Sequence, residues 1–134
     1  MIKRKCDLIV EDGNLRNGKG NVKREHIIMG DEFKGKGKLF ARITIPKGNS
    51  IGMHDHTEDF EVYYILKGVG QVLDNGNLVE VKEGDVIYTA DGNKHYLENI
   101  GVVDLELIAV VLYEWINALE YIQSIILIDL HKYS

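Results

Sequence analysis

Three histidines and one glutamate are spaced so that they could hold a metal ion. His54 and His56 are two residues apart, Glu61 follows five residues later, and His95 lies on a distant segment. In an extended chain alternate side chains point to the same side, so both imidazoles of the His-x-His pair can face one point. Three neutral imidazoles and a carboxylate suit a divalent transition metal such as Mn, Fe, Co, Ni or Zn. Four such ligands leave an octahedral ion two open positions for a substrate or dioxygen.

A His-x-His pair by itself is weak support for a metal site, because two surface or core histidines give the same pattern. The surrounding residues resemble the first motif of the cupin superfamily, which is Gly-x5-His-x-His-x3–4-Glu-x6-Gly. Every fixed position of that motif is matched in this chain, at Gly48, His54, His56, Glu61 and Gly68.

The second cupin motif, Gly-x5-Pro-x-Gly-x2-His-x3-Asn, has a counterpart further along. It is matched at Gly84, Gly92, His95 and Asn99, with Ala90 in place of the proline. That departure reduces the rigidity of a turn but removes no ligand. Fifteen residues, 69–83, separate the two motifs, as in small bacterial cupins.

The resemblance covers roughly residues 39–112 and implies a double-stranded β-helix, a compact jelly-roll barrel. It also implies that His54, His56, Glu61 and His95 hold one divalent metal ion (Mn, Fe, Ni or Zn) inside the barrel. Small single-domain bacterial cupins of this kind are often labelled oxalate decarboxylase-like. Oxalate-degrading members carry an arginine three residues before the first ligand histidine, where this chain has Ile51. They also usually have two fused cupin domains, so the label is weakened here.

Short strands are the elements that must position these residues. Apolar, β-rich runs are separated by turn residues, including Asn75-Gly76, a strong hairpin signal. Strands with turns every 8–12 residues are typical of an all-β sandwich or barrel. The expected strands cover residues 39–45, 60–66, 69–73, 78–81, 86–89, 95–98 and 102–112.

Two flanking segments differ from this barrel. Residues 1–38 hold ten basic and six acidic side chains, which favours a solvated arm packing on the barrel or, alternatively, an arm that binds a polyanion. His26 in this arm is expected to be exposed. Residues 113–134 carry apolar side chains at helical spacing and predict a helical tail, although 125–128 could form a strand instead. The tail would cover the barrel or a neighbouring subunit with Trp115, Leu119, Ile122 and Ile126.

Composition limits the class of protein. The chain has 134 residues, enough for one domain, and its net charge of −5 argues against nucleic-acid binding. A single cysteine, Cys6, excludes an intrachain disulfide and fits a reducing compartment. We expect no membrane partner and a cytoplasmic location, because there is no long apolar run and no signal-peptide pattern. Exposed edge strands favour a homodimer.

Two hypotheses of function remain open. The first is a metal-dependent enzyme, an oxygenase, decarboxylase or isomerase, that acts on a small organic molecule at the three-histidine, one-glutamate site. The alternative is a non-catalytic module that binds a small ligand through the same metal. A general acid or base near the open positions would separate them, and the weak candidates are Tyr63, Tyr88 and Tyr96. Tyr63 shares the face of Glu61 by alternation.

Overall fold

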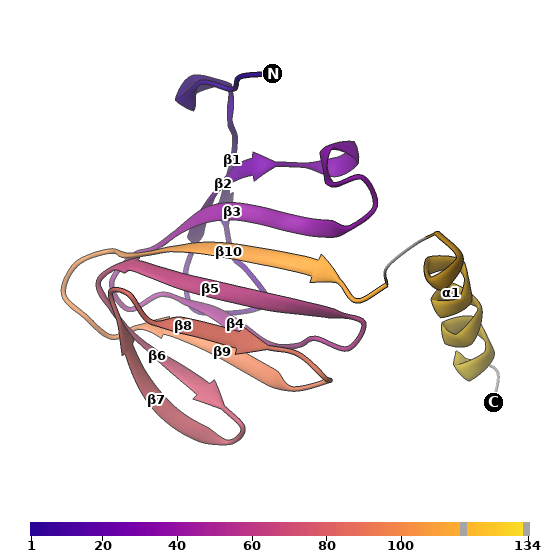
Figure 1. Ribbon diagram of the computed structural model, residues 1–134. Coiled ribbons are helices and arrows are strands. Elements are labelled where there is room, and N and C mark those ends of the chain that lie inside the picture. The colour runs from indigo at the N-terminus through magenta and orange to yellow at the C-terminus, as the bar shows by residue number, and fades with distance from the viewer. Residues whose placement is uncertain (116–117, 133–134) are drawn as a thin grey trace.

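Two antiparallel sheets make up the fold in the computed structural model, which describes residues 1–115 and 118–132. One sheet has the strand order β1-β2-β3-β10-β5-β8, and the other has the order β4-β9-β6-β7 (Figure 1). The predicted all-β fold is confirmed. The strands are β1 (Ile9–Gly13), β2 (Val22–Ile28), β3 (Gly37–Ile45), β4 (Ser50–Asp55), β5 (Asp59–Lys67), β6 (Val69–Asp74), β7 (Asn77–Lys82), β8 (Val86–Thr89), β9 (Lys94–Asn99) and β10 (Leu105–Tyr113).

Alternation of side chains along the strands builds the core. In β5 the side chains of Glu61, Tyr63 and Ile65 are buried, whereas those of Val62 and Tyr64 are more exposed. Successive side chains point to opposite faces of a strand, so one face of β5 lines the interior. β10 follows the same rule and buries Leu105, Leu107, Ala109 and Val111.

Strand pairing brings the predicted metal ligands to one region of the barrel. β4 pairs with β9 in the smaller sheet, where His54 lies opposite His95. β5 belongs to the larger sheet, where Glu61 lies opposite Thr89 of β8 and Val111 of β10. Residues far apart in the sequence therefore meet because the two sheets face each other.

The predicted Asn-Gly hairpin is present between β6 and β7. Asn75 and Gly76 have φ angles of 48° and 81°, and Asp74 pairs with Asn77 across the turn. Two consecutive residues with positive φ match the twist of the flanking strands, which explains why this dipeptide marks the turn.

The first 38 residues contribute two strands and a loop that reaches the other sheet. β1 and β2 extend the six-stranded sheet beyond β3. The loop between them lies on β4, where the Gly52 amide donates to the Leu15 carbonyl at 3.1 Å and the Lys19 amide donates to Ser50 Oγ at 2.9 Å. A Cβ added at Gly18 would overlap the Ser50 carbonyl oxygen. This loop and β4 are therefore in backbone-to-backbone contact. Short 3-10 helices lie at Lys5–Asp7 (η1) and Gly30–Phe33 (η2).

The helix predicted for the tail is confirmed as α1 (Ala118–Lys132), while residues 116–117 and 133–134 of that tail lie outside the described residues. Leu119, Ile122 and Ile126 are 63%, 51% and 52% exposed, so this apolar stripe does not cover the barrel of the same chain. Figure 1 shows α1 beyond the end of β10 and apart from both sheets. No helix within the described ranges has the length and apolar character needed to cross a membrane.

Candidate metal centre

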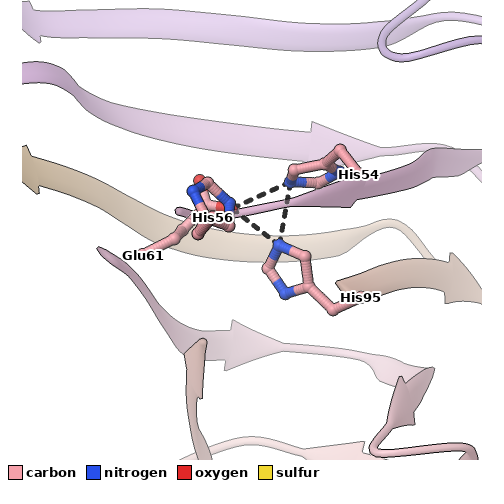
Figure 2. Close-up of side chains that lie close together, drawn as sticks. All are labelled: His54, His56, Glu61 and His95. Atoms are coloured by element: carbon pink, nitrogen blue, oxygen red, sulfur yellow. Dashed lines mark hydrogen bonds and ion pairs between the residues drawn. The ribbon is translucent and has the colours of Figure 1, made fainter. Parts of the chain in front are cut away.

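The four residues whose spacing predicts a metal site converge in the structure. His54 lies at the end of β4, His56 directly follows β4, Glu61 lies in β5 and His95 in β9. One ligand atom from each residue lies within 4.8 Å of the ligand atoms of the other three. Figure 2 shows the three imidazoles around the glutamate side chain. The backbone also ties the site together, because the Gly92 amide, in the turn before β9, donates to the His56 carbonyl at 2.6 Å.

The carboxylate of Glu61 is the centre of this cluster. Its Oε1 atom lies 3.1, 3.0 and 2.9 Å from Nε2 of His54, His56 and His95, respectively. The Nε2 atoms of His54 and His95 are 2.8 Å apart. All four separations are close to the distance of about 3.0 Å between neighbouring ligands of an octahedral ion with bonds of about 2.1 Å. A single divalent ion could therefore contact all four ligand atoms.

Hydrogen bonds on the far side of each ring fix the orientation of the imidazoles. Nδ1 of His54 donates to the Gly52 carbonyl at 2.7 Å, and Nδ1 of His56 donates to Asp59 Oδ1 at 2.6 Å. Nδ1 of His95 pairs with Thr89 Oγ1 at 2.8 Å. A carbonyl and a carboxylate can only accept, so His54 and His56, as neutral imidazoles, carry their proton on Nδ1 and offer the Nε2 lone pair to a metal ion. Such outer hydrogen bonds are typical of metal-binding histidines.

These inward lone pairs need a positive partner. Nitrogen lone pairs from His54 and His56 face the Glu61 carboxylate in a region from which solvent is largely excluded, since Glu61 is 3% exposed. A proton on one ring nitrogen satisfies a single pair of atoms, whereas a cation among the four satisfies all of them. The donor set therefore fits a divalent transition metal.

Burial and hydrogen bonding shift the pKa values of the cluster in different directions. Burial acts to raise the pKa of Glu61, but the imidazole nitrogens around its carboxylate, which donate to it when they carry a proton in place of a metal ion, hold that pKa far below its ordinary value. Burial also acts to lower the pKa of His56, but Glu61 and Asp59 raise it overall. For His95, burial dominates and lowers the pKa. Glu61 therefore remains an anion, as a metal ligand must.

The three candidate tyrosines lie in different places. Tyr63 is buried beside the cluster and stacks on His95, with ring centroids 5.1 Å apart. Burial raises the pKa of Tyr63, so its phenol stays protonated. Tyr88 is 61% exposed on β8, and Tyr96 borders a separate hollow together with Lys19 and Glu98. Of the three, only Tyr63 lies beside the metal cluster.

A cavity of about 250 Å³ extends from this cluster. Its walls are partly apolar, formed by Leu15, Leu39, Ile43, Ile51 and Val111. Three basic side chains from the N-terminal segment also border it, namely Arg16, Arg24 and Lys38.

The sequence did not single out these basic residues, and His26, expected to be exposed, is only 8% exposed. On β2 the residues Val22, Arg24 and His26 alternate, which places them on the inward face. That alternation was the sequence signal that could have predicted the burial of Arg24 and His26. It was obscured by the many charges and glycines of the segment.

Comparison with known proteins identifies related chains. The Cupin domain family matches residues 41–111. A protein from Thermotoga maritima named "Oxalate-binding protein" is 46% identical over 99 residues, which cover 74% of this chain and 82% of that protein. An uncharacterized protein from Methanocaldococcus jannaschii is 35% identical over 89 residues, 66% of this chain and 70% of that one.

Solved structures show the same relationship. The crystal structure of a predicted oxalate decarboxylase from Thermotoga maritima superposes with a TM-score of 0.79 at 42% sequence identity. The superposition covers 84% of this chain and 99% of that chain.

Proposed function

The chain belongs to the cupin family, and we propose that it binds a divalent transition metal and, through that metal, a small carboxylate anion. Oxalate is the first candidate for this anion. The observation that carries the proposal is the convergence of three imidazoles and one carboxylate at a cavity bordered by basic side chains. His54, His56, Glu61 and His95 are the proposed metal ligands, and the metal is Mn, Fe, Ni or Zn.

The size and the charge of the cavity support a small anion. A volume of about 250 Å³ is below the usual range of about 300–1,000 Å³ for drug-sized ligands. Basic side chains at its wall favour negative charge, although the chain as a whole is acidic at −5. The name of the Thermotoga maritima relative adds support for oxalate. The bound metal would act as a Lewis acid at the two positions left open by four protein ligands.

A metal-dependent enzyme is the second candidate, whether oxygenase, decarboxylase or isomerase. The observation that favours it is Tyr63, whose protonated phenol ring stacks on His95 beside the cavity. A neutral phenol next to a metal-bound ligand can donate a proton. No histidine of the described residues is left free for that role near the cluster, because His26 pairs with Glu11 at 2.6 Å.

Metal analysis followed by calorimetry tests the proposal. We expect about one metal ion per chain by plasma mass spectrometry, and a marked loss in the His54→Ala variant. Titration with oxalate should give binding to the metal-loaded protein and none to the metal-free protein. The absence of metal in the wild type, even after reconstitution, would contradict the proposal. Release of formate or carbon dioxide from oxalate in the same samples would favour the enzyme over the binding module.

We also propose that the chain forms a homodimer. Exposed apolar side chains lie on the edge strand β8, at Val86 and Tyr88, and on α1. Pairing through an edge strand would cover them. Light scattering of the full chain and of a chain truncated after Glu114 tests both the dimer and the role of the tail. A monomeric full-length chain would contradict the dimer, and an unchanged dimer after truncation would exclude the tail from the interface.

A further inference from the structure

Arg24 occupies an unusual position for an arginine. It lies on the inward face of β2, between the fully buried Val22 and the buried His26, and opposite Ile43 of β3. Its side chain is only 19% exposed and borders the cavity that leads to the metal cluster. Arginine is rarely buried to this degree without a partner.

The partners of Arg24 within the chain are incomplete. Its nearest carboxylate is Glu11, whose Oε2 atom is 3.8 Å from an Nη atom, while the Oε1 atom of the same carboxylate lies 2.6 Å from Nε2 of His26. Nε of Arg24 is buried and has no hydrogen-bond partner among the residues that the structure describes. The guanidinium therefore keeps donor capacity beside the cavity.

The other basic residues of the cavity wall are placed differently. Nζ of Lys38 lies 2.6 Å from Asp59 Oδ2, so its charge is already compensated. Arg16 lies on the loop that contacts β4. Within the described part of the chain, Arg24 has an unsatisfied buried donor and Lys38 does not.

We infer that Arg24 binds the end of the ligand that is turned away from the metal, and that the ligand is a small dicarboxylate rather than a monocarboxylate. This inference rests on the proposed function. A guanidinium presents parallel N–H donors in a planar fork that matches a carboxylate, whereas an ammonium does not. Arg24 also lies outside residues 41–111, so the selecting residue is carried by the N-terminal segment and not by the part that matches the family.

Oxalate and oxamate are the probes for this inference. Oxamate has nearly the shape of oxalate, but an amide replaces one carboxylate, so the pair isolates the second negative charge. With the metal-loaded full chain, calorimetry should give tighter binding of oxalate by about tenfold or more, as expected for a charged hydrogen bond. Arg24→Gln should weaken oxalate binding by about the same factor and leave oxamate binding within about threefold. The oxalate preference would then be nearly lost, with the metal content unchanged.

Two further variants keep the test decisive. Arg42→Gln is the control, because Arg42 lies on neighbouring β3, is exposed and pairs with Glu106 at 3.3 Å. Arg42→Gln should keep the wild-type preference for oxalate over oxamate. Arg24→Lys retains the charge but not the fork, and should give an intermediate preference even if Arg24→Gln fails to fold.

The outcomes separate this inference from the proposed function. An unchanged oxalate preference in both Arg24 variants, with binding intact, would overturn only the role of Arg24. Equal binding of the two anions by the wild type would overturn the dicarboxylate assignment. Absence of binding of both anions to the metal-loaded wild type would contradict the proposed function itself.

Discussion

The cavity has two ends that are built in different ways. At the metal end (His54, His56, Glu61 and His95), each imidazole has a hydrogen bond on its outer side and a carboxylate on its inner side. At the basic end (Arg16, Arg24 and Lys38), the Arg24 guanidinium has a long ion pair and a buried donor that finds no partner among the described residues. The side chains of the metal end are thus held in place by hydrogen bonds within the chain. The basic end retains donors for which a ligand is the natural partner.

Removing one of the four metal ligands should have the largest effect on metal affinity. His95→Ala removes one of the four ligand atoms, and we expect metal affinity to fall by about 100-fold or more, since loss of outer partners alone costs about 10–100-fold. His26→Ala is the matched control, because His26 is also buried beside the cavity but pairs with Glu11. It should keep about one metal per chain by plasma mass spectrometry. Equal metal loss in both variants would show that the loss does not come from removal of a metal ligand.

Asp59 is the residue that connects the two ends. Oδ1 accepts from Nδ1 of His56 at 2.6 Å, and Oδ2 pairs with Nζ of Lys38 at 2.6 Å. Asp59→Asn weakens the acceptor that fixes the His56 tautomer, so metal affinity should fall by about 10–100-fold in a competition titration with a chelator. Lys38→Met removes the other partner only and should leave metal affinity nearly unchanged. A similar loss in Lys38→Met would mean that the basic end also supports the metal.

The metal end could be predicted from the sequence because its pattern is mostly local. His54, His56 and Glu61 lie within one strand, one turn and the start of the next strand, and the cupin-like spacing supplied His95. The all-β fold and the tail helix were predictable for the same reason, since each depends on a period of two or of 3.6 residues along the chain.

The basic end could not be predicted in this way. Arg24 reaches the cavity only because β2 pairs with β3 in the observed register, and Arg16 only because its loop crosses to β4. Register and loop crossing depend on contacts between distant segments, which composition does not reveal. Asp59 and Thr89 were missed as outer partners because a hydrogen bond to a ring nitrogen leaves no spacing signal.

Acid should destabilise the metal-free protein through the metal end, because arginine and lysine at the basic end keep their charge. Burial acts to raise the pKa of Glu61, but the neighbouring imidazoles lower it overall. The stabilisation that Glu61 provides is therefore complete above the ordinary glutamate pKa of 4.5 and is lost as the pH falls below that value. Burial lowers the pKa of His95, so its contribution is lost below the ordinary value of 6.5. His56, with a raised pKa, contributes in the opposite sense and loses stabilisation as the pH rises above 6.5.

The expected result is a fall in melting temperature of about 10 °C between pH 4.5 and pH 2.5 for the metal-free wild type, because the stabilisation by Glu61 is lost below pH 4.5. Glu61→Gln removes the carboxylate and should flatten this part of the curve in differential scanning calorimetry. An equally steep fall in Glu61→Gln would place the acid sensitivity outside the metal end.

The smallest effect on metal affinity should come from a substitution that displaces the loop carrying Arg16 and leaves the four metal ligands in place. A Cβ at Gly18 would overlap the Ser50 carbonyl, so Gly18→Ala pushes the loop that carries Arg16 away from β4. We expect the free energy of unfolding to fall by about 1–3 kcal/mol, as for other overpacked sites, with metal affinity unchanged. Gly13→Ala is the control, because nothing lies within 4 Å of a Cβ at that position.

Chemical denaturation and metal titration of the two glycine variants measure both quantities. Loss of metal affinity in Gly18→Ala would mean that the loop holds β4, and with it His54, in position. Stability loss with unchanged metal affinity would instead show that the barrel strands alone position the metal ligands. The N-terminal segment could then alter the basic end of the cavity without disturbing the metal, which is how one metal-binding barrel can accommodate different anions.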